Sequence, residues 1–272
     1  MELAVQDFNL KHTLECGQLF RFERRGDWYF VTARDRLFVV RQPHEKVVEF
    51  RGNIDATFMT HFFRLNVDYS DIVRSIARDK EIATALQAFW GLRLIRQDPW
   101  ECLASYIVSQ HANIAKIKRN LDALAACHGA RLELDNYESW SFPGPEQLKN
   151  RGALIRCKLG FRADYLYETA QHTNEAWLAF LASLPYQEAK AQLMSLPGVG
   201  PKIADCVLLF SLGFDEAFPV DVWIKRVMQE LYFEGREVAN EKIVEFGQSY
   251  FGNYAGWAQQ FLYAWARQRA KK

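Results

Sequence analysis

The segment Leu196-Pro-Gly-Val-Gly-Pro-Lys202 is the feature that most constrains how this chain can fold. Gly198 and Gly200 permit the positive φ angles and the close backbone approach that a tight hairpin between two helices needs. Pro201 suits the first position of the following helix, where its missing N–H costs nothing. The segment therefore predicts two helices joined by a glycine hairpin, with the second helix beginning near residue 201.

The start of that second helix is also a chemical signal. Unpaired amides at a helix start attract phosphate, and a hairpin of this kind holds nucleic-acid backbone without reading bases. Lys202 lies at this electropositive end, where nearby positive potential and partial burial disfavour the ammonium form. A neutral lysine amine is a nucleophile. An ordinary solvated lysine is the alternative, but the hairpin favours a catalytic Lys202.

A second motif follows the hairpin at Pro219-Val220-Asp221-Val222. It predicts another helix start with Asp221 as the N-cap residue. Capping alone would explain the aspartate, but the same carboxylate can also face Lys202 across a cleft, and the two roles are compatible. Lys202 and Cys206 are four residues apart, so they share a helix face.

The composition limits the class of protein. With 272 residues and 49% hydrophobic residues, the chain can bury a substantial core as one large domain or two modest ones. Its net charge of +1 gives no global basic signature, so nucleic acid would be met by a local patch. Candidate basic clusters, each also readable as a solvated helix face, are Lys116, Lys118 and Arg119; Arg156, Lys158 and Arg162; and Lys225 and Arg226.

The cysteines and the hydropathy pattern predict where the protein works. The five cysteines are scattered without metal-like spacing, and none follows Cys206, which excludes a four-cysteine iron–sulfur cluster near the C-terminus. We therefore expect no metal, no cofactor and a reducing compartment. No apolar run is long enough to span a bilayer and no signal segment opens the chain, so we expect a soluble intracellular protein without membrane contact.

The pattern along the chain predicts an α+β architecture. Aromatic and β-branched runs at 28–31, 37–40 and 46–50 predict a small antiparallel sheet, and from about Ser70 helical periodicity continues to the end. A loop is expected at 143–145 and a bend or helix start at Pro185. We expect an N-terminal sheet domain with flanking helices over 1–95, packed on a larger helical domain over 96–272 that carries the hairpin.

These motifs together resemble the 8-oxoguanine DNA glycosylase/AP lyases of the helix-hairpin-helix superfamily. The resemblance spans nearly the whole chain and is strongest where the hairpin, Asp221 and the N-terminal Gly-Gln-x-Phe-Arg occur together. Its anchors are Cys16–Phe22, Arg96–Glu101, Asn113–Ile117, Leu159–Ala163, the hairpin with Val220-Asp221, and Tyr254–Gln259.

The resemblance implies a monomer that acts on damaged double-stranded DNA, with the damaged base rotated out of the duplex. Lys202 would attack the anomeric carbon of the sugar, and Asp221 would stabilise the cationic sugar. The resulting imine would permit β-elimination and strand cleavage. In the base pocket, Gly17 would offer its carbonyl to the N7 hydrogen of 8-oxoguanine. Gln259 would bind the Watson–Crick edge, with Tyr263 and Cys206 on the two faces of the base.

The residues alone favour plainer roles for several of these positions. Gly17 also fits a simple turn, and Tyr263 and Cys206 also fit ordinary core. A glycosylase for another lesion, such as an alkylated base, keeps the same scaffold. A non-catalytic DNA-binding module would use the hairpin only for phosphate.

The resemblance also implies the contacts with the opened duplex. Phe161 would wedge into the stack, although it also fits a loop aromatic tucked into the core, and Arg162 would bond the orphaned base. Further DNA contacts are implied at His111, Lys116, Gly198, Gly200 and Trp223. Well-known eukaryotic members have arginine where Lys116 stands, and lysine cannot make the planar two-pronged contact of arginine. We therefore hypothesise weaker discrimination of the base opposite the lesion.

Overall fold

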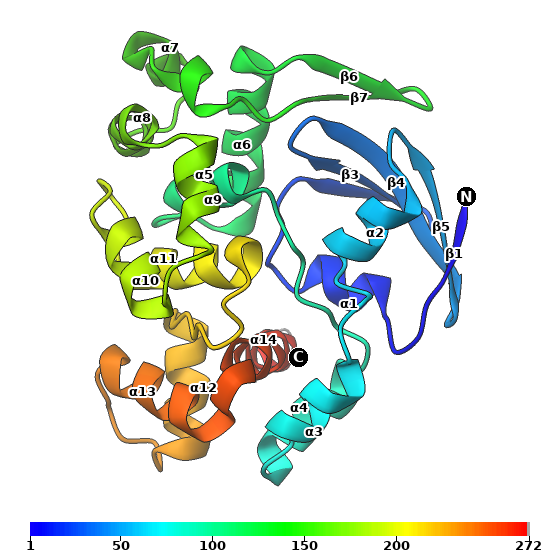
Figure 1. Ribbon diagram of the computed structural model, residues 1–272, viewed down its shortest axis with the longest axis vertical. Helices are drawn as coiled ribbons and strands as arrows, with labels where there is room; N and C mark the ends of the chain where they lie inside the picture. The colour runs from blue at the N-terminus through cyan, green and yellow to red at the C-terminus, as the bar shows by residue number, and fades with distance from the viewer. Residues whose placement is uncertain (271–272) are drawn as a thin grey trace.

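The computed structural model describes residues 1–270, and its N-terminal part is a five-stranded antiparallel sheet (Figure 1). The spatial order of the strands is β1-β5-β4-β3-β2. Their bounds are β1 Glu2–Ala4, β2 Phe22–Arg25, β3 Trp28–Ala33, β4 Arg36–His44 and β5 Val47–Gly52. The three expected strands are therefore confirmed, and two short strands are added at the sheet edges.

One face of this sheet forms its own small core. Val31 pairs with Phe38 and Val40 pairs with Phe50 across neighbouring strands, and all four side chains are buried. Side chains at alternate positions of a strand point to the same face, which is why this set meets in one layer. The layer is covered by α1 (Leu10–Glu15) and α2 (Ala56–Phe62).

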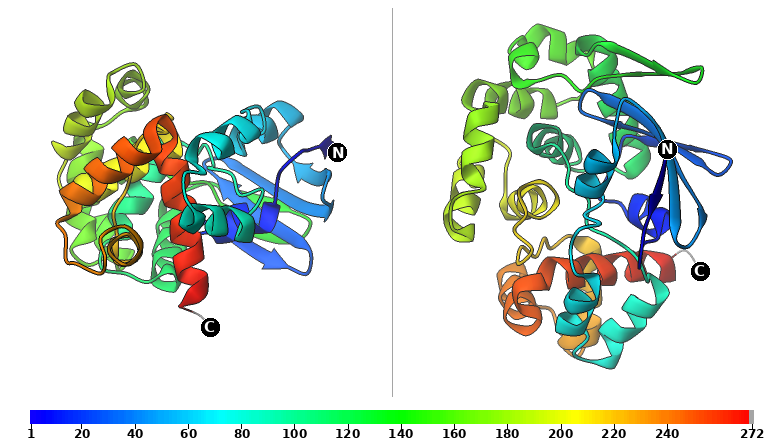
Figure 2. Two further views of the ribbon diagram at one scale, coloured as in Figure 1. Left: turned by 90° about the horizontal axis from the view of Figure 1, so that it is seen from below. Right: turned by 45° about the vertical axis from the view of Figure 1, so that its right-hand side comes forward.

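The rest of the described chain is mainly helical, as expected. The α-helices are α3 Tyr69–Ile76, α4 Lys80–Ala88, α5 Pro99–Val108, α6 Ile114–His128, α7 Arg151–Arg156, α8 Arg162–His172, α9 Glu175–Leu181, α10 Tyr186–Met194, α11 Pro201–Val207, α12 Val222–Tyr232, α13 Asn240–Phe251 and α14 Ala255–Arg269. Short 3-10 turns lie at Pro145–Leu148 and Gly252–Tyr254, and a π-helical turn, η2, at Leu208–Leu212. Figure 2 shows α14 running between the sheet and the other C-terminal helices.

The helices share one large core. Ile72 of α3 and Ile82 of α4 belong to it, together with buried residues from α5 onwards. These two helices thus precede residue 95 in the sequence but pack with the helical part. The division into domains at residue 95 stays a prediction.

One expectation about the helical part is wrong. The strands β6 (Arg131–Leu134) and β7 (Tyr137–Trp140) form an antiparallel hairpin where continuous helical patterning was expected. Asp135 and Asn136 join them with φ angles of 50° and 59°. Positive φ at both turn residues matches the right-handed twist of a hairpin, and aspartate and asparagine tolerate it well. Each strand has four residues, which is too short for a clear alternating pattern.

The glycine hairpin joins α10 to α11 as predicted, with Pro201 in the first turn of α11. Gly198 has φ +75°, and a Cβ there would lie 2.5 Å from the ring of Tyr165. Gly200 caps α11 with φ −90° and has open space around it. The conformational need for glycine therefore holds at Gly198 only. Pro185, the expected helix start, directly precedes α10.

Candidate active site

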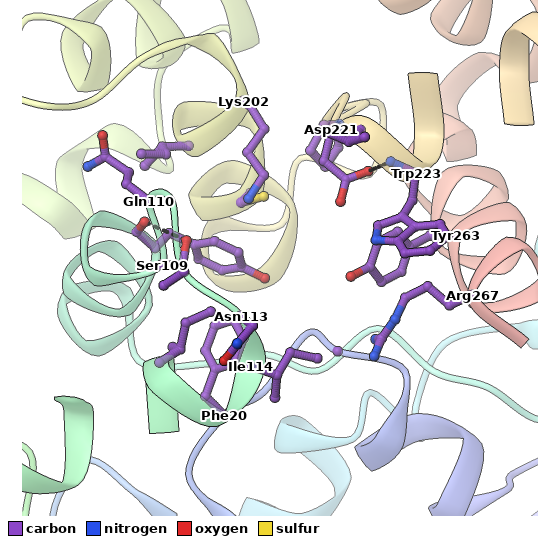
Figure 3. Close-up of a pocket in the computed structure, with 18 of the residues that line it drawn as sticks. Phe20, Ser109, Gln110, Asn113, Ile114, Lys202, Asp221, Trp223, Tyr263 and Arg267 are labelled. Atoms are coloured by element: carbon purple, nitrogen blue, oxygen red, sulfur yellow. Dashed lines mark hydrogen bonds between the residues drawn. The ribbon is translucent and has the colours of Figure 1, made fainter. Parts of the chain in front are cut away.

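A cavity of about 930 Å³ opens between five segments of the chain (Figure 3). One segment lies at Gly17–Phe20, before the second strand, and the others come from the helical part. These are the stretch from Tyr106 to Ile117, α11 with η2, the turn before α12, and α14. The cavity therefore brings Lys202, Asp221, Gly17, Cys206, Gln259 and Tyr263 together, which are all the residues predicted for catalysis and for the base pocket.

Lys202 lies half-buried in the first turn of α11. Its Nζ is 4.8 Å from the centre of the Tyr106 ring, a cation–π distance. Cys206 lies one turn further along the helix. Burial raises the pKa of the Cys206 thiol to about 11, although Lys202 beside it lowers the pKa. The thiol is therefore neutral near pH 7. Tyr106, which the sequence analysis missed, gave no signal beyond that of a buried core aromatic.

Asp221 is the N-cap of α12, as predicted. Its Oδ1 accepts hydrogen bonds from the amides of Trp223 at 2.9 Å and Ile224 at 2.8 Å. The carboxylate lines the same cavity as Lys202, and Figure 3 shows it facing the cavity. One oxygen thus satisfies the helix end, while the other is available to the cavity. The capping role and the cleft-facing role are present together.

Gln259 contributes a buried polar atom that has no partner. Its Nε2 donates to the carbonyl of Pro219 at 3.1 Å, but its Oε1 has no hydrogen-bond partner among residues 1–270. The residue is only 4% exposed and lines the cavity. Because a buried polar atom without a partner is costly, an acceptor in this position indicates a ligand that donates to it.

Gly17 and Tyr263 form the wall opposite α11. Gly17 has φ +94°, and a Cβ there would lie 3.3 Å from the Tyr263 ring. Burial raises the pKa of Tyr263 to about 12, against the opposing effect of Arg267. The tyrosine is therefore a neutral aromatic surface at neutral pH. The ring lies close to the Gly17 backbone, and both line the cavity.

Arg267 is a cavity residue that the sequence analysis missed. Its Nη1 donates to the carbonyl of Cys16 at 3.4 Å, and its guanidinium lies 5.3 Å from the Tyr263 ring centre. A signal did exist, because Gln259, Tyr263 and Arg267 follow one another at steps of four residues, which places them on one helix face.

Comparisons with known proteins identify the family of this chain. Residues 1–103 match the model of the 8-oxoguanine DNA glycosylase N-terminal domain. A solved structure of MBOgg1 with a low-affinity DNA ligand is 35% identical, covers 99% of this chain and 96% of that one, and superimposes with a TM-score of 0.93. The chain belongs to the 8-oxoguanine DNA glycosylase family.

Two further proteins match over nearly their whole length. The 8-oxoguanine glycosylase/lyase of Clostridium acetobutylicum, solved with double-stranded DNA containing cytosine opposite 8-oxoguanine, is 32% identical with a TM-score of 0.90. That match covers 99% of this chain and 98% of the other. A probable N-glycosylase/DNA lyase of Methanothermobacter thermautotrophicus is 29% identical over 98% of this chain and 96% of its own.

Of the residues that the family resemblance assigns to DNA, two lie together, and one of them, His111, lines the cavity. His111 is exposed with φ 48°, and its ring lies 6.1 Å from that of Phe161 in an edge-to-face arrangement. Phe161 is 47% exposed, which is unusual for a large apolar side chain. The structure therefore places Phe161 on the surface rather than in the core, the alternative that the sequence left open.

Arg162, which the resemblance assigns to the orphaned base, is bonded to backbone carbonyls of the protein itself. It is 4% exposed, its Nε donates to the Gln110 carbonyl at 2.7 Å, and its Nη1 donates to the Leu159 carbonyl at 3.2 Å. The guanidinium thus ties α8 to the end of α5 instead of pointing outward. Backbone carbonyls satisfy its donors in the protein without DNA, and a role at the orphaned base requires exchange of these bonds.

The remaining assigned residues flank the cavity. Trp223 lines it beside Asp221, whereas Lys116 is exposed on α6 next to the lining residues Ala115 and Ile117. Gly198 and Gly200 lie in the hairpin before Lys202. Across residues 1–270, no helix is both long enough and apolar enough to cross a membrane.

Proposed function

We propose that this protein excises 8-oxoguanine from duplex DNA and then cleaves the strand at the abasic site. The observation that carries the proposal is the shared cavity of Lys202, Asp221 and the unpartnered Oε1 of Gln259. The named glycosylase/lyase relatives support an enzyme over a non-catalytic DNA-binding module. They also support oxidised guanine over the alkylated-base alternative.

The proposed reaction begins with a damaged nucleotide rotated into the cavity. The amine of Lys202 bonds to C1′ of the sugar while the bond from C1′ to the base breaks, so the base leaves with the electron pair. The carboxylate of Asp221 stabilises the positive charge that develops on the sugar. The lysine–sugar adduct then becomes an imine, whose acidic C2′ proton permits β-elimination of the 3′ phosphate.

Base recognition follows from the acceptors and the aromatic wall of the cavity. The Oε1 of Gln259 accepts from the N–H groups on the Watson–Crick edge of guanine. The carbonyl of Gly17 accepts from the N7 hydrogen that 8-oxoguanine has and guanine lacks. Tyr263 stacks on one face of the base and Cys206 lies against the other. A base without the N7 hydrogen leaves an acceptor unpaired, at about 1–3 kcal/mol.

The DNA backbone and the gap left by the base are held outside this cavity. The amides of the Gly198–Gly200 hairpin bind a phosphate, Phe161 fills the stack beside His111, and Trp223 contacts the DNA next to Asp221. Lys116 supplies one positive charge near the orphaned base. Because lysine lacks the planar fork of arginine, we expect weaker discrimination among the four bases opposite 8-oxoguanine than an arginine at this position would give. A strong cytosine preference in an excision assay with each of the four bases would contradict this part.

The decisive experiment is borohydride trapping, because reduction makes an imine between an amine and DNA permanent. Duplexes with 8-oxoguanine, an alkylated base or no damage are incubated with the wild type and with Lys202→Gln. We expect an adduct only with 8-oxoguanine, and none with Lys202→Gln although it still binds duplex. Lys242→Gln, an exposed lysine in the first turn of α13, is the matched control and should trap normally. Trapping by Lys202→Gln would show that another amine is the nucleophile.

The sequence-based expectations of a monomer, an intracellular location and no cofactor or metal stay predictions. Gel filtration with and without duplex tests the first. Excision in the presence of a chelator tests the last.

A further inference from the structure

Arg267 is a second basic side chain in the cavity, and neither the proposed reaction nor base recognition uses it. Arg269, two residues along α14, forms an ion pair with Glu230 at 2.9 Å. Arg267 has no carboxylate partner among residues 1–270, and its hydrogen bond there is the 3.4 Å contact with the Cys16 carbonyl. Figure 3 shows Lys202 and Arg267 extending into the cavity from different walls. A guanidinium without a counter-ion in a cavity is a site for negative charge.

The position of this guanidinium depends on Gly17. A Cβ at Gly17 would lie 2.5 Å from Nη1 of Arg267, which is closer than any real contact of that kind. The missing side chain therefore leaves the space that the guanidinium occupies. The Cys16 carbonyl and the Tyr263 ring hold it there. The arginine thus lies beside the Gly17 backbone and the Tyr263 ring, the two groups on this wall that are assigned to base recognition.

Negative charge arises in this cavity during the proposed reaction, on which this inference rests. When the C1′–N9 bond breaks, the electron pair stays with the purine and spreads from its ring nitrogens to its carbonyl oxygens. The new bond from Lys202 to C1′ leaves an extra proton on the lysine nitrogen. The departing base takes up a proton, and the lysine nitrogen loses one, so the number of protons is conserved. Until that transfer the base carries negative charge, and this charge is larger in the transition state than in the bound substrate. A fixed positive charge beside the base therefore lowers the barrier.

We propose that Arg267 is a catalytic residue that donates an N–H to a carbonyl oxygen of the flipped purine and stabilises its charge as the base departs. The ligand class is a purine with ring carbonyl oxygens, bound as the incipient anion. Asp221 acts on the positive sugar and Arg267 on the negative base. The positive charge on the sugar is thus stabilised by a carboxylate at the start of α12. The negative charge on the base is stabilised by a guanidinium on α14.

The test separates base release from strand cleavage. Single-turnover base excision is measured on duplex with 8-oxoguanine, and strand cleavage on a preformed abasic duplex, which has no base to release. For Arg267→Gln we expect excision to fall by about 10- to 100-fold while abasic-site cleavage stays within about twofold. Arg267→Lys keeps the charge and should recover most of the loss. Arg269→Gln, an exposed position on the same helix, is the control and should excise like the wild type.

A second measurement distinguishes charge stabilisation from a structural role. Excision is compared for purine leaving groups of increasing acidity, and the effect of Arg267→Gln should shrink as the base becomes a better leaving group. The proposal would be overturned if Arg267→Gln excised 8-oxoguanine at the wild-type rate. It would also be overturned if the variant lost excision and abasic-site cleavage to the same extent. A wild-type protein that cleaves abasic sites but never releases 8-oxoguanine would overturn the proposed substrate and this inference together. Normal excision by the wild type with an unaffected variant overturns this inference alone.

Discussion

Asp221→Asn separates the two roles of Asp221, because asparagine keeps the cap and removes the charge. The cap consists of hydrogen bonds from the amides of Trp223 and Ile224 to Oδ1, at 2.9 and 2.8 Å. An asparagine Oδ1 accepts the same bonds, and asparagine caps helices as well as aspartate does. The lost attraction between the carboxylate and the helix dipole costs about 0.3–1 kcal/mol. We therefore expect a free energy of unfolding within about 1 kcal/mol of the wild type.

The activity should respond far more strongly than the stability. A neutral amide cannot stabilise a cationic sugar, and groups of this kind are worth about 10²–10³ in rate, or about 2.7–4 kcal/mol. Asp221→Ala should show the same kinetic loss, with an additional loss of about 0.5–2 kcal/mol of stability from the missing cap. The assays are urea unfolding and single-turnover excision of 8-oxoguanine.

The matched control is Asp68→Asn, at the N-cap of α3, where the side chain accepts from the Asp71 amide at 2.9 Å. This cap lies outside the cavity, so the variant should excise at the wild-type rate and unfold within about 1 kcal/mol of it. The reasoning fails if Asp221→Asn excises within threefold of the wild type. The reasoning also fails if Asp221→Asn lowers the free energy of unfolding as much as Asp221→Ala does. That result would show that the cap depends on the negative charge of Asp221.

Three further changes test the cavity and the helices beside it. Gly17→Ala should cut excision more than tenfold and spare abasic-site cleavage, since the new Cβ meets Arg267 at 2.5 Å; its φ of +94° adds about 1–2 kcal/mol of strain, visible in thermal unfolding. Lys190→Met removes the cation 2.9 Å from the buried carboxylate of Asp205 and should lower the free energy of unfolding by about 3–5 kcal/mol. Burial raises the pKa of Asp205, and Lys190 lowers it. Without Lys190 the folded protein therefore binds a proton at this carboxyl more readily than the unfolded chain does. Urea unfolding should accordingly show that the variant gains stability as the pH falls from 7 to 5. Finally, a thiol reagent at pH 8 should label the exposed Cys127 before Cys206; the pKa of Cys206 near 11 leaves about one thiolate per thousand at that pH, and its labelling should rise about tenfold per pH unit up to 11.

The parts of the site that the sequence predicted correctly are those fixed by neighbours along the chain. The hairpin follows from Gly198 and Pro201, whose backbone preferences act within a few residues. The capping role of Asp221 likewise involves only the next three residues. Predictions of this kind depend only on local backbone preferences, so they hold whatever the tertiary packing around the segment.

Sequence patterns could not predict the features that depend on tertiary contacts. The carbonyl of Gln110, 52 residues away, takes the donors of Arg162 and buries its side chain, while its role at the orphaned base stays a prediction. Arg267 has the right helical spacing, yet its role depends on the space left by Gly17 on another segment. The β6–β7 hairpin was missed because four-residue strands carry too little pattern. In each case the deciding interaction is invisible until the segments are packed.

Hydrogen bonds between distant segments help to fix the geometry of the cavity. Gln18, next to Gly17, accepts from the side chain of Gln97 at 2.8 Å through its carbonyl. The backbone amide of Gln97 in turn donates to the carbonyl of Phe210 at 2.8 Å, in the π-helical turn that continues the helix of Lys202. Two buried bonds thus connect the base-binding wall to the helix of the nucleophile. Catalysis needs the base-binding groups and the nucleophile already in place. These two bonds therefore help to fix the distance between the Gly17 wall and Lys202.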